Sequence, residues 1–354
     1  MTGSAARPQV EARPRPSLPV GDDLVLALDL GATRTRAAVV APDGSIASRS
    51  ERPTPRAASG AELAAGCIQT LREALEAVEP SAGSRITAIG VSAPGPLDPA
   101  TGTLIDPPNL GPGARSLALA DAIAASLDLG VAIDRDTQVA LLGEMAYGVA
   151  RGSTDVVYLT VSTGIGGAVV SDGRRLVGPD GTAGELGHLV VELDGPACGC
   201  GAKGHLEAIA SGTGIARRAT EHGFPQGTTA RDVAAAEDAG DPTATLIMDR
   251  ARRAFAAACV SIADIFDPDL IVVGGSVARA QGERWLRPAR DAVVAYAFGA
   301  AARRTRVVAA TLGDDVGLLG AQPLVAERLG PRNERIHSPV VAAGSAAGST
   351  AATG

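Results

Sequence analysis

The chain repeats one local order of predicted elements, and this repetition limits the folds that it can adopt. Residues 24–28 form a short apolar run, which predicts a buried strand, and residues 29–33 follow as a turn of small residues. Residues 156–161 predict a second buried strand, and a similar turn follows at residues 162–167. In both places a further strand and an Asp-Gly hairpin turn come next, at residues 43–44 and 172–173. The repetition therefore predicts two related domains that face one another.

Strands alternate with helical patterns along the rest of the chain, which predicts a mixed α/β architecture. Further strands are expected at residues 37–40, near 46, and at 86–91, 131–133, 168–170, 270–273 and 307–308. Helices are expected at residues 59–79 and 116–126, through most of 205–298, and at 316–327. We expect an N-terminal domain at 23–134 with 312–329 and a C-terminal domain at 135–311. The Pro- and Arg-rich residues 1–22 and the Ala-, Gly- and Ser-rich residues 330–354 predict a disordered leader and tail.

Composition excludes several classes of protein. Hydrophobic residues make up 45% and charged residues 20% of the 354 residues, which is typical of a globular protein with a large core. The net charge of -7 argues against nucleic acid as a partner, because binding its phosphates needs a basic surface. No apolar run approaches the roughly 18 residues of a membrane span, and the N-terminus lacks a secretory signal. We therefore expect no membrane partner, a cytoplasmic protein and no disulfide framework among its 4 cysteines.

Two turns of small residues follow the two buried strands of the repeat. Their small residues let backbone N–H groups approach phosphate oxygens, and the threonine hydroxyl adds a donor. Each turn alone can equally be a tight connection. Together they suit a triphosphate held between two domains, and Gly274-Gly275 after a third strand is another such turn. The candidate ATP-binding residues are Asp29, Gly31, Ala32, Thr33, Thr163, Gly164, Gly166, Gly167, Gly274 and Gly275.

Asp136 follows a predicted strand and precedes a predicted helix. An aspartate in this place can cap the helix N-terminus. In a cleft beside a sugar hydroxyl it can instead orient the nucleophile and accept its proton. The residues alone favour the cap.

Cysteine and histidine cluster in one short stretch of the chain. Cys198 and Cys200 lie between His188 and His205, so half of the 4 cysteines and half of the 4 histidines fall there. Two thiolates and two imidazoles are a ligand set that suits tetrahedral zinc. The alternative is a pair of inert thiols and two ordinary surface histidines.

With these segments in order, the chain resembles the ROK family of sugar kinases and repressors from about Leu24 to about Leu329. The motifs that carry the resemblance are Asp29–Thr33 (DLGAT), 93–96 (APGP), Asn109-Leu110, Asp136, 142–144 (LGE), 163–167 (TGIGG), 183–188 (AGELGH), 198–201 (CGCG) and Gly274-Gly275.

The resemblance implies a two-domain actin-like ATPase fold, of the ribonuclease H-like type, with the active site in the intervening cleft. It implies that the first two turns bind the phosphates of ATP and that Gly274 and Gly275 lie beside the adenine nucleotide. Asp136 would be the catalytic base. The residues that contact the sugar would be Asn109, Arg135, Asp136, Glu185, His188 and Glu207, and the zinc ligands would be His188, Cys198, Cys200 and His205.

Three positions depart from the pattern of the family. Arg135 stands where an asparagine that contacts the sugar is usual, and Gln138 stands where another asparagine is common. His205 stands in place of a third cysteine, which still leaves two histidines and two cysteines for zinc.

The function that follows is transfer of the γ-phosphoryl group of ATP, with Mg²⁺, to the 6-hydroxyl of a hexose. Glucose is the expected sugar, in a reaction that would feed glycolysis; fructose, allose, mannose and N-acetylmannosamine are alternatives. A sugar-responsive repressor would need a DNA-binding helix pair of ~60 residues before the first strand, and only about twenty residues precede Leu24. A non-catalytic sugar sensor would not need Asp136. We also expect a homo-oligomer, a dimer or tetramer.

Overall fold

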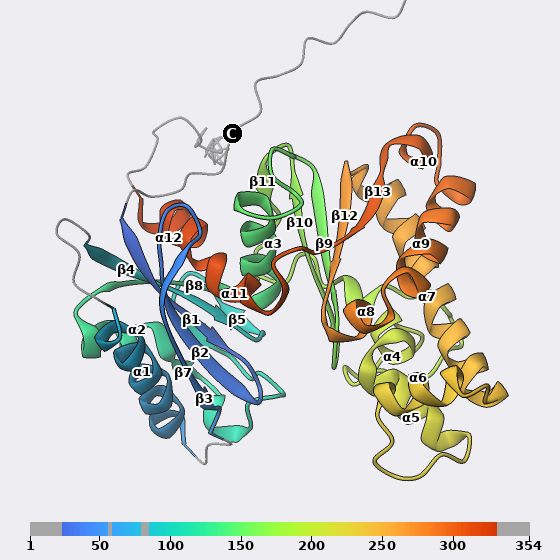
Figure 1. The fold of residues 1–354 in the computed structure, drawn as a ribbon, viewed down its shortest axis with the longest axis horizontal. Coiled ribbons are helices and arrows are strands. Elements are labelled where there is room, and N and C mark those ends of the chain that lie inside the picture. The colour runs from blue at the N-terminus through green and yellow to red at the C-terminus, as the bar shows by residue number, and fades with distance from the viewer. Residues whose placement is uncertain (1–22, 56–58, 79–84, 331–354) are drawn as a thin grey trace, which may run out of the picture.

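The computed structural model describes residues 23–55, 59–78 and 85–330. The predicted leader lies outside these residues, as does the predicted tail from residue 331. Two five-stranded sheets organise the described chain, one in each of two lobes (Figure 1). The first lobe is the first sheet with the helices that cover it, and the second lobe is the second sheet with its helices.

The two sheets share one topology, so the predicted duplication is confirmed at the level of strand order. The first sheet has the order β3-β2-β1-β4-β8 and the second has the order β11-β10-β9-β12-β13. In each sheet three antiparallel strands are followed by two that run parallel to the central strand. The strands of the first sheet are β1 (Leu24–Leu30), β2 (Arg34–Val40), β3 (Ile46–Pro53), β4 (Ile86–Ala93) and β8 (Gly130–Arg135). Those of the second are β9 (Val156–Val161), β10 (Ile165–Ser171), β11 (Arg174–Arg175), β12 (Leu270–Gly274) and β13 (Arg306–Ala309).

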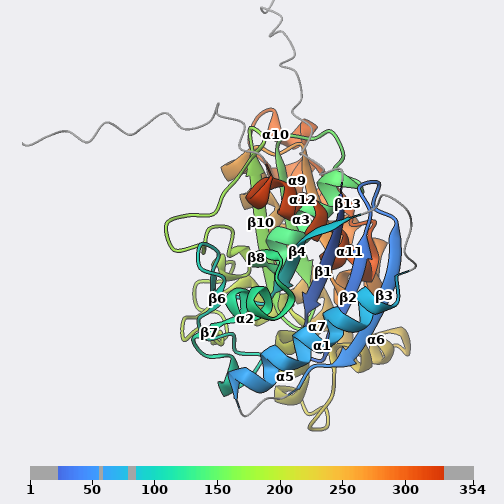
Figure 2. The ribbon, with the colours of Figure 1, turned by 90° about the vertical axis from the view of Figure 1, so that its left-hand side faces the viewer.

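Helices cover the outer face of each sheet and bury its apolar side chains. In the first lobe, α1 lies across β2 and β3 (Figure 2). The elements of this lobe outside the five-stranded sheet are α1 (Gly60–Glu76), β5 (Leu97–Asp98), β6 (Thr103–Leu104), a 3₁₀ turn (Pro112–Ala114), β7 (Leu117–Ala118), α2 (Leu119–Leu127), a 3₁₀ turn (Gly313–Asp315), α11 (Val316–Leu319) and α12 (Ala321–Leu329). Those of the second lobe are a 3₁₀ turn (Leu186–His188), α4 (Leu206–Ala210), α5 (Gly212–Glu221), α6 (Ala230–Asp238), α7 (Pro242–Phe266), α8 (Ser276–Gln281), α9 (Glu283–Tyr296) and α10 (Ala301–Arg304).

Helix α3 (Asp136–Ala146) lies between the two sheets and is buried on both sides (Figure 1). Val139 and Leu142 pack in the core with strands of the first sheet and with α11 and α12. Leu141 and Met145 pack in another core with strands β9, β10 and β12 of the second sheet. One helix therefore contributes to the hydrophobic cores of both lobes.

Three local expectations differ from the structure. The helix expected from residue 116 begins at Leu119, because Leu117-Ala118 pairs with β6 as strand β7. The helix expected at 316–327 is interrupted at Gly320, which packs so closely on the backbone of α3 that a Cβ there would lie 2.0 Å from the carbonyl oxygen of Val139. Gly166 and Gly167 lie inside strand β10 and not in the turn before it, since both pair with β9.

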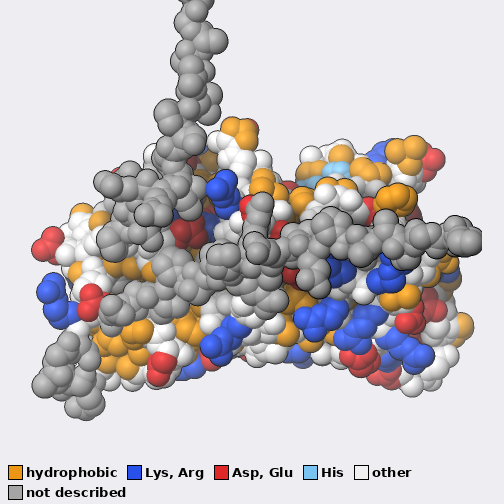
Figure 3. Space-filling model, turned by 90° about the horizontal axis from the view of Figure 1, so that it is seen from above, with side chains coloured by type: hydrophobic (Ala, Val, Ile, Leu, Met, Phe, Trp, Pro, Cys, Tyr) orange, Lys and Arg blue, Asp and Glu red, His pale blue; other side chains and the backbone are white. Residues whose placement is uncertain are grey.

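Charges of both signs are interspersed over the molecule. On the face seen from above, Lys and Arg side chains lie beside Asp and Glu side chains (Figure 3). Many of them form ion pairs, such as Arg284 with Asp238 at 2.5 Å. Among the described residues, no helix is both long and apolar enough to cross a membrane. The predicted domain boundaries stay a prediction, and Arg135, expected in the C-terminal domain, is the last residue of β8 in the first sheet.

Candidate active site

Asp136 stands at the start of α3, where the chain leaves the first sheet. The structure makes Arg135 the N-cap residue and Asp136 the first residue of the helix. The expectation that Asp136 is the capping residue is therefore wrong by one position, because β8 continues to Arg135. The Asp136 carboxylate still accepts a hydrogen bond from the N–H of Thr137, at 2.7 Å.

The Asp136 side chain is accessible to solvent, but protein of both lobes surrounds it. This surrounding protein displaces bulk water from the carboxylate and raises its pKa to about 6. The N–H of Thr137 opposes the rise, the charge of Asp29 adds to it, and Arg135 and Glu185 act with opposite signs. A carboxylate with this pKa is mostly ionised at neutral pH and is a stronger base than an ordinary aspartate.

The first turn connects β1 to β2 beside Asp136. Asp29, at the end of β1, accepts hydrogen bonds from Arg36 at 2.5 Å and from Ser92 at 2.9 Å. The carbonyl oxygens of Gly31 and Thr33 accept hydrogen bonds from Thr54, which fixes the backbone of the turn. Ala32 and Thr33 are exposed, so the tip of the turn is available to a ligand.

The second turn connects β9 to β10 on the other side of Asp136. The N–H of Ile165 donates to the carboxylate of Glu207 at 2.9 Å, and Thr163 is exposed at the tip. A Cβ on Gly166 would lie 2.7 Å from the side chain of Thr137, so the strand start packs directly on the first turn of α3. Asp136 is therefore bracketed by one turn from each lobe.

The third turn, Gly274-Gly275, lies next to the second turn. Ser276 and Ser162 share a hydrogen bond of 2.9 Å between their hydroxyls. Gly275 has a φ of 93°, and a Cβ there would lie 2.4 Å from the carbonyl oxygen of Val161. Glycine is required at this position by both its backbone conformation and the close approach of β9.

The segment that carries Glu185 and His188 packs on the start of β10. A Cβ on Gly187 would lie 1.9 Å from the carbonyl oxygen of Ile165. The carboxylate of Glu185 forms an ion pair with Arg135, and the second Nη of Arg135 donates to the carbonyl oxygen of Ala183 at 2.6 Å. Arg135 therefore connects the two lobes beside Asp136.

His188, Cys198, Cys200 and His205 converge, and their ligand atoms all lie within 4.8 Å of one another. Nδ1 of His188 lies 3.1 Å from Nδ1 of His205, and the Sγ atoms of Cys198 and Cys200 lie 3.8 and 3.3 Å from a histidine Nδ1. Ligands at zinc bond lengths of about 2.0–2.3 Å in a tetrahedron are separated by about 3.3–3.8 Å. The four side chains therefore fit one tetrahedral zinc ion.

Asn109 is the predicted site residue that the structure does not bring into contact with the others. It is exposed in the turn that follows β6, between Pro107 and Leu110. Its part in sugar binding stays a prediction.

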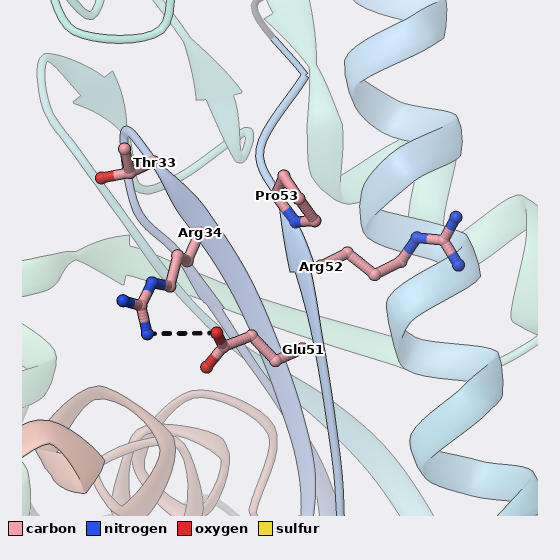
Figure 4. Close-up of a pocket in the computed structure, with 5 residues that line it drawn as sticks. All are labelled: Thr33, Arg34, Glu51, Arg52 and Pro53. Atoms are coloured by element: carbon pink, nitrogen blue, oxygen red, sulfur yellow. Dashed lines mark hydrogen bonds and ion pairs between the residues drawn. The ribbon is translucent and has the colours of Figure 1, made fainter.

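A depression of about 210 Å³ lies beside the first turn and is lined by Thr33, Arg34, Glu51, Arg52 and Pro53 (Figure 4). Arg34 pairs with Glu51 there at 3.2 Å, while the guanidinium of Arg52 points away from Glu51 and pairs with Glu73 of α1. It contains none of the acidic residues gathered around Asp136. We therefore locate the candidate site at Asp136 and not in this depression.

Sequence reasoning missed a buried ionic cluster behind Asp136. Asp134 accepts from Arg175 at 2.8 Å and from Arg328 at 2.9 Å, and Arg175 also binds Glu327 at 2.6 Å. The Arg175 and Asp134 side chains are 4% and 2% exposed. The cluster joins β8 and α12 of the first lobe to β11 of the second. No motif announces it, because its partners are far apart in sequence.

The comparisons with known proteins agree with this geometry. The profile of the ROK family matches residues 25–328. A glucokinase from Thermotoga maritima is 35% identical over 319 residues, covering 86% of this chain and 98% of that protein. An N-acetylmannosamine kinase from Escherichia fergusonii is 36% identical over 296 residues, covering 84% of this chain and 96% of that protein.

Among solved structures, a ROK family glucokinase from Streptomyces griseus in complex with glucose and AMPPNP has a TM-score of 0.68. It is 30% identical, and the match covers 85% of this chain and 98% of that chain. The duplicated sheets with a site between them are those of the actin-like ATPase fold, as predicted. With a family profile that matches nearly all of the described residues, this chain belongs to the ROK family.

Proposed function

We propose that this protein is an ATP-dependent hexose kinase that phosphorylates the 6-hydroxyl of glucose. The observation that carries the proposal is the position of Asp136 between a turn from each lobe, with Asp29 and Glu185 close enough to influence its pKa. This arrangement suits a triphosphate and a sugar hydroxyl that meet at one carboxylate.

In the proposed reaction, Asp136 accepts a hydrogen bond from the sugar 6-hydroxyl and takes its proton. The bond from O6 to the γ-phosphorus forms while the bond from that phosphorus to the β–γ bridging oxygen breaks, and ADP leaves. The transition state of phosphoryl transfer is loose, so the proton leaves late and orientation of the hydroxyl matters as much as basicity. A pKa of about 6 suits this role at neutral pH.

The nucleotide enters as its magnesium complex, which is a substrate in this proposal. The exposed tips of the first two turns, with Ala32, Thr33 and Thr163, are the surfaces offered to the phosphates. Gly274 and Gly275 leave room for the adenine nucleotide beside Ser276. Because ATP is an intracellular metabolite, we expect the reaction in the cytoplasm.

Sugar hydroxyls are proposed to bind Glu185, His188, Glu207 and Asn109. Carboxylate oxygens accept from hydroxyl groups, and losing one such bond typically costs about 1–3 kcal/mol. Glu207 keeps part of its surface accessible while one oxygen bonds to the backbone of the second turn. Glu207 is thus suited to couple the sugar to the turn that would hold phosphate.

Zinc is proposed as a structural ion held by His188, Cys198, Cys200 and His205. Four protein ligands leave no open position for water, so the ion would supply architecture and no chemistry of its own. It would hold the loop that carries His188 against the start of α4, which carries Glu207.

A homo-oligomer stays our expectation. Val294, Tyr296 and Phe298 at the end of α9 are 68%, 77% and 85% exposed, and large exposed apolar side chains favour association. Light scattering on the eluting protein should give twice or four times the mass of the chain.

The test of the function is a coupled ADP-release assay with glucose, fructose, allose, mannose and N-acetylmannosamine. We expect the highest kcat/KM with glucose. The second candidate is an N-acetylmannosamine kinase, which the relative from Escherichia fergusonii favours. Turnover with N-acetylmannosamine and none with the hexoses would replace the first proposal by the second.

A further inference from the structure

Arg135 crosses the candidate site in a way that ordinary packing does not explain. Its side chain is 5% exposed although it carries a full charge, and its Nε is buried without a hydrogen-bond partner. Burying a guanidinium group with an unsatisfied donor lowers stability. The cost suggests that the charge is kept at this place for a purpose other than folding.

The Arg135 side chain is held at both ends. Its aliphatic part lies against the loop after β4, where a Cβ on Gly95 would lie 3.0 Å from Cδ of Arg135. Its guanidinium reaches the second lobe, where Nη1 binds Glu185 and Nη2 binds the carbonyl oxygen of Ala183 at 2.6 Å. Two donors in a rigid fork fix both the position and the direction of the Glu185 carboxylate.

Arg135 also changes the charge of the site. Asp29, Asp136, Glu185 and Glu207 supply four carboxylates around the space between the turns. Arg36 pairs with Asp29, and Arg135 pairs with Glu185. Without Arg135 the carboxylate of Glu185, with 39% of its side chain exposed, would face the sugar as an uncompensated negative charge.

We propose that Arg135 determines specificity, by neutralising Glu185 across the cleft so that the site accepts neutral hexoses and rejects cationic amino sugars. The inference rests on the proposed function, since it concerns the sugar that the same site binds. A protonated amino group is attracted by an uncompensated carboxylate and repelled by the guanidinium. Removing the positive charge should therefore favour the amino sugar over the neutral one.

The experiment compares glucose with glucosamine at about pH 6.5, where an amine is protonated. Both kcat/KM and the dissociation constant without ATP, by titration calorimetry, are measured for each sugar. The variants are Arg135→Met, which removes the charge and the donors, and Arg135→Lys, which keeps the charge but cannot bind both partners. Arg304→Met is the matched control, because Arg304 forms an exposed ion pair with Asp267, and α10 lies outside the cleft.

We expect Arg135→Met to lower the preference for glucose over glucosamine by about tenfold or more, in binding and in kcat/KM. Arg135→Lys should keep most of the discrimination while raising KM for glucose, and Arg304→Met should change neither. An unchanged preference in a folded Arg135→Met protein would overturn the proposal. Loss of discrimination in Arg135→Lys equal to that in Arg135→Met would also overturn it, because geometry and not charge would then decide.

Failure of this inference can be distinguished from failure of the proposed function. A wild-type protein that phosphorylates no sugar, but binds glucose with the preference described, would refute the kinase and keep the role of Arg135. A wild-type protein that phosphorylates glucose, with the same preference after Arg135→Met, would keep the kinase and refute the role of Arg135. If Arg135→Met does not fold, Arg135→Gln, which keeps polarity without charge, gives the same comparison.

Discussion

Asp136 begins a helix and faces the space between the two lobes, so its carboxylate has both a structural and a chemical environment. Its acceptance of the Thr137 N–H stabilises the start of α3, where the helix dipole also favours a negative charge. The burial that raises its pKa comes from the whole molecule and not from its neighbours in sequence.

Substituting Asp136 by asparagine separates these two environments. Asn keeps the size and can still accept from the Thr137 N–H, but it cannot take a proton. We expect kcat to fall by about 10²-fold or more, with little change in the melting temperature. Steady-state kinetics and thermal unfolding check this, and activity within a few-fold of the wild-type value would reject Asp136 as the base.

The pH dependence of kcat/KM should report the same carboxylate. The base acts when deprotonated, so kcat/KM should fall about tenfold per pH unit below the pKa of about 6 and level off above it. An aspartate with an ordinary pKa would move this limb to about pH 4. Profiles are to be recorded for wild type and Asp136→Asn together, because a limb that persists in the variant belongs to the nucleotide. A wild-type profile that is flat down to pH 5 would contradict the prediction.

At this scale the sequence identifies the type of residue better than its contacts. Asp136 could be selected from its place after a strand and from its resemblance to a family position. Its raised pKa could not, because it depends on Asp29 and Glu185, which are distant in sequence. Glu144 is a similar case, since its motif was visible but its four hydrogen bonds to Val149, Thr311 and Leu312 were not.

At the scale of elements, the loop between His188 and His205 joins two parts of the site. It brings the four candidate zinc ligands together, and α4 follows it directly with Glu207, which bonds to the second turn. A metal ion in this loop would therefore influence the turn proposed to hold phosphate.

Purified protein is expected to contain about one zinc per chain by elemental analysis. His205→Ala removes one ligand, so the zinc content should fall well below one and KM should rise for both the sugar and ATP. His222→Ala is the control, because His222 is exposed at the end of α5, outside the ligand group. Wild-type protein with far less than one zinc per chain would refute the structural metal.

The elements themselves were largely predictable, because apolar runs and Gly or Asp-Gly turns mark their limits. The duplication, both Asp-Gly hairpins and strand β12 were confirmed. Element ends were less certain where small residues serve tertiary packing. Gly320 interrupts a pattern that looks continuously helical, and Gly166 and Gly167 read as a turn although they pair in a strand.

At the scale of the whole molecule, the sequence predicts two related halves but not how they are joined. The ionic cluster of Asp134, Arg175, Glu327 and Arg328 draws on three elements that no local pattern connects. Arg135 and Glu185, which form the ion pair across the cleft, are 50 positions apart in the chain. Long-range pairs of this kind depend on the three-dimensional fold and leave no spacing in the sequence.

Helix α3 has a thermodynamic consequence for the molecule. Because Val139 and Leu142 complete one core while Leu141 and Met145 complete another, neither lobe can lose its core without exposing apolar surface of the same helix. The described lobes should therefore melt as one cooperative unit, even though domains joined by a small interface often unfold separately. In scanning calorimetry the van't Hoff enthalpy should equal the calorimetric enthalpy in a single transition. Two resolved transitions in the ligand-free protein would mean that α3 stays folded with one lobe after the other has melted.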